Sequence, residues 1–131
     1  MTVHYLDSSA LLKRVLDEAE SAVLRSWIDA ELRDGAALVT SDLGDVEVAR
    51  AARRYNFSEH EEQSATTDVR FRIIDERVIE RARVVGDATL RSLDAIHLAT
   101  ALVIGVDTLV TYDDRLGQAA RNAGLDVIAP G

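Results

Sequence analysis

The sequence predicts an α/β protein: a three-layer α/β/α sandwich in which helices cover both faces of a mostly parallel sheet. Short apolar runs alternate along the chain with longer segments of helical spacing, and this alternation is typical of repeated strand–helix units. The chain has 131 residues, of which 47% are hydrophobic and one is proline. This length and composition fit a single domain, residues 1–131, with one core.

The first elements show clear start signals. Residues 3–6 form an apolar run that predicts a strand, and residues 8–18 have helical spacing. Ser8 or Ser9 can cap this helix, because a serine hydroxyl accepts from an unpaired N–H at a helix start. Residues 18–35 continue as an amphipathic helix. Its predicted apolar stripe consists of Ala22, Val23, Trp27, Ile28 and Leu32.

The rest of the chain continues the alternation of strands and helices. Ser41 is a second N-cap candidate, directly after an apolar run. Further strands are expected at residues 36–40, 71–74, 107–112 and 126–130. Further helices are expected at residues 42–56, 58–69, 76–86, 90–105 and 113–124.

The charge balance restricts the function. The formal net charge is 15 − 23 = −8, which suits a cation site or a basic partner better than a nucleic-acid surface, usually marked by basic patches. Cysteine is absent, which excludes disulfides and thiolate metal sites. The sequence shows neither a signal peptide nor a run that could cross a membrane, so we expect a cytoplasmic protein.

Four acids lie at comparable places in the predicted fold. Asp7 follows the first strand and Asp113 follows the strand at 107–112, at the sheet edge where open parallel sheets bind ligands. Asp94 begins an apolar, buried helix, where an unpaired carboxylate is costly. Glu47 lies in the helix after the second strand, on a stripe of small and apolar neighbours.

Each acid taken alone has a simpler role, because acids are favoured at helix N-termini. His97, one turn after Asp94, is a candidate partner for that carboxylate and is expected to be a buried, hydrogen-bonded histidine. Together, carboxylates at one edge repel one another unless a cation neutralises them or some are protonated. Hard oxygen ligands suit Mg²⁺ or Mn²⁺, so the pattern suggests metal-dependent phosphodiester hydrolysis.

Four segments occur in a characteristic order: YLDSSALLK at 5–13, a glutamate in the helix after the second strand, LRSLDAIHLATAL at 90–102 and LVTYDDRLGQAARNAG at 109–124. They resemble a PIN domain, specifically the VapC-type toxins of toxin–antitoxin pairs. The resemblance implies an α/β/α sandwich and an endoribonuclease that uses Mg²⁺ or Mn²⁺. It also implies a homodimer and inhibition by a cognate VapB-type antitoxin.

The resemblance also implies roles for individual residues. Asp7 and Asp94 match the metal-binding aspartates, Glu47 matches the acid after strand two, and Asp113 matches the acid after the TY dipeptide. The neighbouring Asp114 leaves this last assignment open by one position, and Asp113 is preferred. The supporting residues are Thr111, which matches a threonine or serine that orients the acids, and Ser9. Apart from the resemblance, basic residues near the four acids are candidate RNA phosphate contacts, because local fields rather than net charge decide docking: Lys13, Arg14, Arg50, Arg53, Arg54 and Arg115.

Rival interpretations place an aspartate after the first strand too. A haloacid-dehalogenase-like phosphatase requires a second aspartate two residues later, where this chain has Ser9. A receiver-like domain requires a lysine after a late strand, and none is evident. A third alternative is a non-catalytic PIN-like interaction module in which the acids only cap helices.

Overall fold

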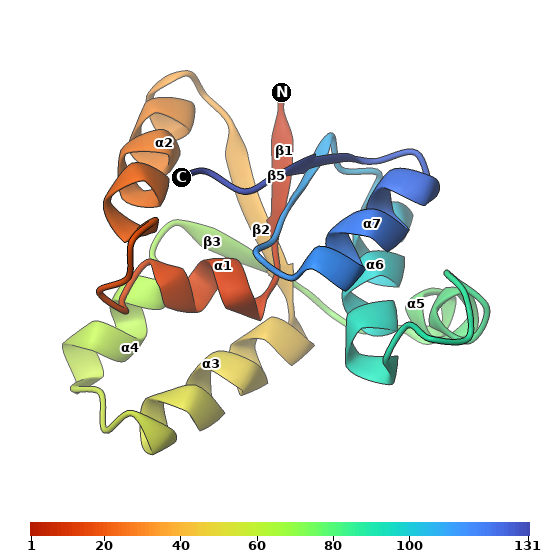
Figure 1. The fold of residues 1–131 in the computed structure, drawn as a ribbon, viewed down its shortest axis with the longest axis horizontal. Helices are drawn as coiled ribbons and strands as arrows, with labels where there is room; N and C mark the ends of the chain where they lie inside the picture. Colours follow the sequence, from red (N-terminus) through yellow and green to blue (C-terminus); the bar gives the residue numbers. More distant parts are fainter.

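The computed structural model describes residues 1–131, which form a single sheet with helices packed on both faces (Figure 1). The strands are β1 (Val3–Leu6), β2 (Ala37–Ser41), β3 (Val69–Arg72), β4 (Thr108–Val110) and β5 (Asp126–Ile128). The helices are α1 (Ser8–Lys13), α2 (Ser21–Arg33), α3 (Asp42–Arg54), α4 (Glu59–Ala65), α5 (Glu76–Ala82), α6 (Ser92–Ile104) and α7 (Asp114–Asn122). None of these helices is long and apolar enough to cross a membrane.

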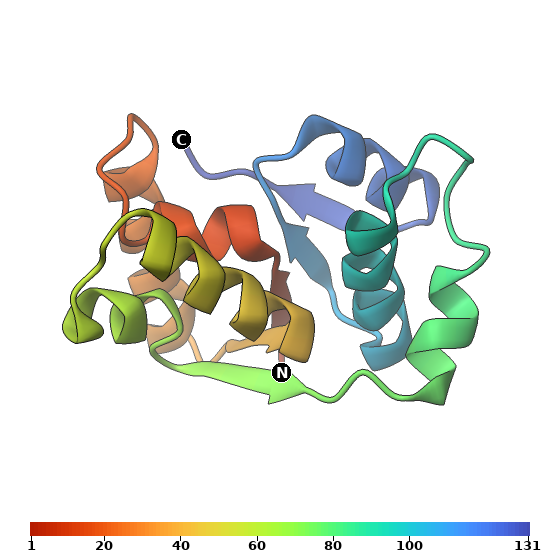
Figure 2. The same ribbon diagram turned by 90° about the horizontal axis from the view of Figure 1, so that it is seen from below.

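The sheet has the strand order β3-β2-β1-β4-β5, and all four neighbouring pairs are parallel. The chain moves from β1 outward to β3 and then returns across β1 to β4. Since crossovers between parallel strands are right-handed, this reversal places α1–α4 on one face and α5–α7 on the other (Figures 1 and 2). The predicted α/β/α sandwich is confirmed, and its sheet is wholly parallel.

The central strands are buried on both faces, and their side chains alternate between two cores. Leu6, Leu38 and Val110 point to the helices α1–α4, whereas Tyr5 and Leu109 point to α6 and α7. All five side chains are at most 1% exposed. This arrangement explains why the strands are apolar runs without the polar alternation of a half-exposed sheet.

The structure corrects the predicted stripe of α2. Ala22 and Val23 are exposed, the latter to 51%, whereas Leu24, which was not in the predicted stripe, is fully buried. Ile28 is buried as predicted. At the start of α2, the Ser21 hydroxyl donates to the Leu16 carbonyl at 2.6 Å and accepts from the Glu18 amide at 3.0 Å. These bonds hold a turn between α1 and α2, so the predicted helix at 8–18 ends early.

The third strand is also displaced, since it spans residues 69–72 rather than 71–74. Its position is set by backbone pairing with β2, in which Leu38 lies opposite Val69. Phe71, in the edge strand β3, is 46% exposed, and Ile73, just beyond the end of this strand, is 70% exposed. The prediction, which used apolar content alone, therefore placed this strand two residues too late.

Gly44, in the first turn of α3, permits a close packing contact with β2. The Thr40 hydroxyl donates to the Leu6 carbonyl at 2.8 Å, and a Cβ built on Gly44 would lie 2.2 Å from that hydroxyl oxygen. We expect Gly44→Ala to destabilise the fold by about 1–3 kcal/mol through overpacking, despite the better helix propensity of alanine. Urea unfolding measures this change.

Gly117→Ala in α7 is the matched control for this prediction. A Cβ at Gly117 meets nothing closer than Val127 at 3.4 Å, an ordinary van der Waals contact. The control should be neutral or stabilising, because alanine favours helix. Equal stability of Gly44→Ala and wild-type protein would contradict the packing argument.

Candidate active site

The four predicted acids gather where the strand order reverses, beyond the carboxyl ends of β1 and β4. In open parallel sheets this is the position at which ligands bind. A pocket of about 550 Å³ opens there. Its lining residues are Glu47, Arg91, Ser92, Leu93, Asp94, Asp113, Asp114 and Arg115. Asp7 does not line this pocket, and it is only 3% exposed.

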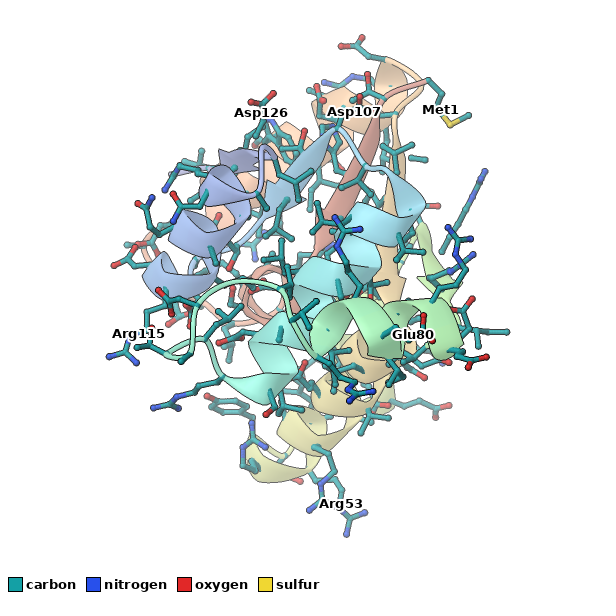
Figure 3. All side chains as sticks on the ribbon, turned by 90° about the vertical axis from the view of Figure 1, so that its right-hand side faces the viewer. Met1, Arg53, Glu80, Asp107, Arg115 and Asp126 are labelled. Atoms are coloured by element: carbon teal, nitrogen blue, oxygen red, sulfur yellow. The ribbon has the colours of Figure 1, made fainter.

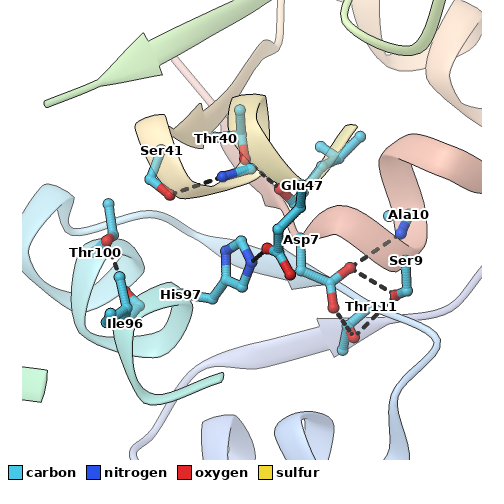
Figure 4. A network of polar contacts seen from close by, with 12 residues as sticks. Asp7, Ser9, Ala10, Thr40, Ser41, Glu47, Ile96, His97, Thr100 and Thr111 are labelled. Carbon is cyan, nitrogen blue, oxygen red and sulfur yellow. Dashed lines mark hydrogen bonds and ion pairs between the residues drawn. The ribbon is translucent and has the colours of Figure 1, made fainter. Parts of the chain in front are cut away.

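Asp7 is held by three hydrogen bonds (Figure 4). Its Oδ1 accepts from the Ala10 amide at 3.0 Å and from the Ser9 hydroxyl at 2.7 Å, and its Oδ2 accepts from the Thr111 hydroxyl at 2.6 Å. Asp7 is thus the N-cap of α1, and the expectation that Ser8 or Ser9 would cap this helix is wrong. A carboxylate offers about four acceptor positions, so Oδ2 keeps one for a further ligand.

Thr111 and Ser9 connect Asp7 to the segment that follows β4. Thr111 Oγ1 accepts from the Asp113 amide at 3.0 Å, and Ser9 Oγ accepts from the Tyr112 amide at 3.0 Å. Each hydroxyl therefore uses its proton on Asp7 and its lone pair on the neighbouring backbone. This pairing fixes both the side chain of Asp7 and the start of the loop that carries Asp113.

Burial raises the pKa of Asp7 and of Asp94, and repulsion from neighbouring acids adds to this effect at Asp94. The pKa of Asp7 is raised chiefly by burial, although the hydrogen bonds from Thr111 and Ser9 act in the opposite direction. The pKa of Asp94 is raised first by burial and then by the charge of Asp113, with smaller contributions from Asp7 and Glu47. The charges of Asp113, Asp7 and Glu47 therefore all oppose the ionisation of Asp94.

The donor set fits a hard divalent cation held mainly by water. The pocket offers carboxylate oxygens and neither imidazole nor thiolate ligands. No three His, Asp or Glu side chains are close enough to hold an ion by themselves. Mg²⁺ retains several waters and binds through one or two carboxylates plus substrate phosphates, so this open arrangement is compatible with such an ion.

Glu47 reaches the pocket from α3 and is anchored from behind by His97. Glu47 Oε1 lies 2.6 Å from His97 Nε2, and the histidine is 1% exposed. The prediction of a buried, hydrogen-bonded histidine is confirmed. Its hydrogen-bond partners are Glu47 and the Tyr5 hydroxyl rather than the expected Asp94.

The two candidates for the fourth acid differ in their connections. Asp113 is the N-cap of α7 and accepts from the Leu116 amide at 2.8 Å, and its own amide reaches Thr111. Asp114 is the first residue of α7, lines the same pocket and makes no side-chain hydrogen bond within the chain. Only Asp113 is linked to Asp7 through a shared side chain.

Two of the predicted phosphate contacts are occupied elsewhere in the fold. Lys13 pairs with Glu18 at 3.2 Å and Glu20 at 3.0 Å. Arg14 donates at 3.0 Å to the backbone carbonyl of Ala65, the last residue of α4, and to that of Thr67. Structural contacts of this kind leave both cations away from the pocket.

The arginines that flank the pocket are Arg115, as expected, and Arg91. Sequence reasoning missed Arg91, although its place three residues before Asp94 at the start of an apolar helix was a usable signal. Arg50 is exposed on α3 but does not line the pocket. Figure 3 shows Arg53 extending from the far end of α3, whereas Arg115 extends from the start of α7.

Residues 4–122 match the family model of the PIN domain, and the chain belongs to this family. It is 40% identical to ribonuclease VapC47 of Mycobacterium tuberculosis over 136 residues, which cover 97% of this chain and 96% of that protein. It is also 41% identical to ribonuclease VapC46 of the same organism over 133 residues, 99% of each chain. Within the PIN family, the chain is therefore of the VapC type.

Solved structures of VapC toxins share the fold. VapBC2 from Rickettsia felis, crystallised with a promoter DNA fragment, has a TM-score of 0.77 at 8% identity and covers 99% of this chain and 100% of that chain. VapC20 of Mycobacterium tuberculosis has a TM-score of 0.72 at 16% identity, covering 97% and 99%. At these identities, the likeness concerns the fold alone.

Proposed function

We propose that this protein is a Mg²⁺- or Mn²⁺-dependent endoribonuclease, the toxin of a toxin–antitoxin pair, which hydrolyses RNA phosphodiester bonds at the acidic pocket. The observation that carries the proposal is the convergence of acids from separate elements on one pocket, flanked by Arg91 and Arg115. The names of the full-length relatives, which are ribonucleases of the VapC type, support the same activity.

In this proposal, the residues of the site have distinct tasks. Asp7, through the open position on Oδ2, and Asp94 would hold the ion, with Glu47 and Asp113 beside it. A bound divalent cation lowers the pKa of an attacking water and offsets negative charge on the phosphate. Thr111 and Ser9 keep Asp7 from rotating, because each donates to one of its two carboxylate oxygens.

An acidic protein can still bind RNA at this place. Net charge is a sum over the whole surface, whereas docking depends on the local field. Arg91 and Arg115 are exposed at the pocket, and a guanidinium can bind a phosphate through two parallel hydrogen bonds. We therefore assign the phosphates beside the scissile bond to these two arginines.

Arg91→Gln and Arg115→Gln are each expected to raise KM for RNA more than they lower kcat. Each should also weaken the salt dependence of binding, by about 0.7 in the slope of log K against log salt for each phosphate of single-stranded RNA that is no longer neutralised. Fluorescence anisotropy at several salt concentrations measures this slope. Arg77→Gln, which removes an exposed arginine of α5 outside the pocket, is the control, and an equal effect there would contradict the assignment.

The activity itself is tested with purified protein, free of any antitoxin, on total bacterial RNA. Cleavage is expected with Mg²⁺ or Mn²⁺, and it should stop when EDTA is added. Cleavage that continues in EDTA would contradict metal dependence. No cleavage under any metal condition, by protein that is folded, would contradict the nuclease proposal.

We also propose a VapB-type antitoxin and a homodimeric state. The related solved structures include VapBC2 of Rickettsia felis and a toxin–antitoxin complex from Klebsiella pneumoniae, and a net charge of −8 suits a partner with a basic arm. Size-exclusion chromatography with light scattering is expected to give the mass of a dimer. A monomer at high concentration would contradict the dimer.

A further inference from the structure

We propose that His97 is a positioning residue which, together with Tyr5 and Ser41, holds Glu47 at the pocket and fixes the elements that carry the other acids. The inference rests on the proposed nuclease function and extends it to residues outside the pocket lining. His97, Tyr5 and Ser41 are each at most 1% exposed, so none of them is available to substrate.

A continuous chain of polar contacts connects these residues to Glu47. Glu47 Oε1 lies 2.6 Å from His97 Nε2, and His97 Nδ1 lies 2.7 Å from the Tyr5 hydroxyl. The Tyr5 hydroxyl also lies 3.0 Å from Ser41 Oγ, within hydrogen-bond distance, and that oxygen accepts from the Gly44 amide at 3.3 Å. Both nitrogens of the imidazole are therefore satisfied, and the ring cannot turn without breaking a buried bond.

The chain connects the elements on which the acids are mounted. Tyr5 lies in β1, two residues before Asp7, and His97 lies in α6, three residues after Asp94. Ser41 is the N-cap of α3, the helix that carries Glu47. A single histidine thus ties α6 to β1 on one side and to α3 on the other.

Only one of the two carboxylate oxygens of Glu47 is hydrogen-bonded within the protein. Its Oε1 is held by His97, whereas its Oε2 accepts no hydrogen bond from the protein and its side chain is 26% exposed. The carboxylate belongs to the pocket lining. A side chain anchored at one oxygen and free at the other is suited to present the free oxygen to the site at a fixed position.

The geometry suggests a pair of variants that separates the two ends of the chain. The side-chain amide nitrogen of a glutamine lies about as far from Cα as the Nε2 atom of a histidine. In His97→Gln this amide can therefore still donate to Glu47. The shorter side chain of asparagine reaches only as far as the Nδ1 atom of a histidine. His97→Asn therefore removes the hydrogen bond to Glu47. We expect His97→Asn to lower kcat about 10- to 100-fold, with KM for RNA little changed, and His97→Gln to retain most of kcat.

A double-mutant cycle distinguishes positioning from a general structural role. If His97 acts through Glu47, His97→Asn should cause no further loss of kcat when Glu47 is already replaced by glutamine. Equal fold losses in both backgrounds would overturn the inference. Tyr5→Phe removes only the contact to Nδ1 and leaves Nε2 beside Glu47, so it should lower kcat less than His97→Asn does. If His97→Asn does not fold, NMR of the wild-type ring tests the inference.

Nitrogen-15 histidine NMR supplies a test independent of activity. The wild-type His97 ring should show an N–H proton protected from solvent exchange, and its resonance should shift in both Tyr5→Phe and Glu47→Gln. A rapidly exchanging ring would overturn the inference. If the wild-type protein cleaves RNA and His97→Asn has the same kcat, the inference is also overturned. If the wild-type protein cleaves no RNA, the proposed function is overturned instead.

Discussion

Replacement of Asp7 by asparagine is expected to lower kcat for RNA cleavage more than about 100-fold, because metal-ion catalysis is worth several kcal/mol. The same substitution should leave the metal-free protein folded. The asparagine carbonyl can accept from the Ala10 amide and the Ser9 hydroxyl as Oδ1 does. Its amide nitrogen would then face the Thr111 hydroxyl, which can accept as well as donate.

The stability of the variant should depend on pH in a defined direction. Asp7 has a folded-state pKa raised above its ordinary value of 3.8 by burial. A group with a raised pKa contributes stability that is present below the unfolded-state pKa and is lost as pH rises through the folded-state pKa. The asparagine side chain of the variant does not titrate. The melting temperature of Asp7→Asn minus that of wild type, measured in EDTA, should therefore increase as pH rises above about 4.

Divalent metal should stabilise the wild-type protein relative to Asp7→Asn. An ion that binds only the folded state stabilises it by about 2.7 kcal/mol at a concentration 100 times Kd. Mn²⁺ should therefore raise the melting temperature of wild-type protein and leave that of Asp7→Asn unchanged. Equal metal-induced shifts in both proteins would contradict the role of Asp7 as a ligand.

Asp94→Asn is expected to cause a comparable loss, again more than about 100-fold in kcat. The substitution removes a carboxylate whose pKa is raised by burial and by the charge of Asp113. Repulsion within the pocket falls, so folding should be unaffected or slightly favoured. Steady-state cleavage of a labelled RNA oligonucleotide measures the loss, and thermal melting in EDTA verifies that the protein is folded.

Asp114→Asn is the matched control, because Asp114 lines the same pocket and the substitution removes the same charge. Asp114 is exposed and makes no side-chain hydrogen bond to Asp7, Ser9 or Thr111. Most of kcat should therefore remain. A loss in Asp114→Asn as large as in Asp94→Asn would mean that Asp114, rather than Asp113, belongs to the site. It would also correct the choice made from the TY dipeptide.

Periodicity and topology made much of the site predictable. Strand–helix alternation predicts a parallel sheet, and the rule for ligand sites at strand ends then places Asp7 and Asp113 at one edge. Asp94 was identifiable because burial of an unpaired carboxylate in an apolar helix costs free energy, which indicates a partner or a bound ion. Each of these inferences depends on local sequence and on general rules of α/β folds.

The misassigned residues depend on contacts that sequence spacing does not determine. Whether Asp7 or a serine caps α1 depends on the extended backbone at Asp7. The partner of His97 depends on how α3 packs beside α6, since Glu47 and His97 are 50 residues apart. Arg14 was predicted to contact RNA, but it is bonded instead to the carbonyls of Ala65 and Thr67, more than 50 residues away in the sequence.

The central claim is that Asp7 and Asp94 hold one divalent ion at the carboxyl edge of the sheet. Anomalous diffraction from crystals soaked in Mn²⁺ tests it most directly. We predict one peak within coordinating distance of Asp7 Oδ2 and the Asp94 carboxylate, with the Ser9 and Thr111 bonds to Asp7 retained. A peak coordinated only by Asp113 and Asp114, or no peak in the pocket at a Mn²⁺ concentration that supports cleavage, would contradict it.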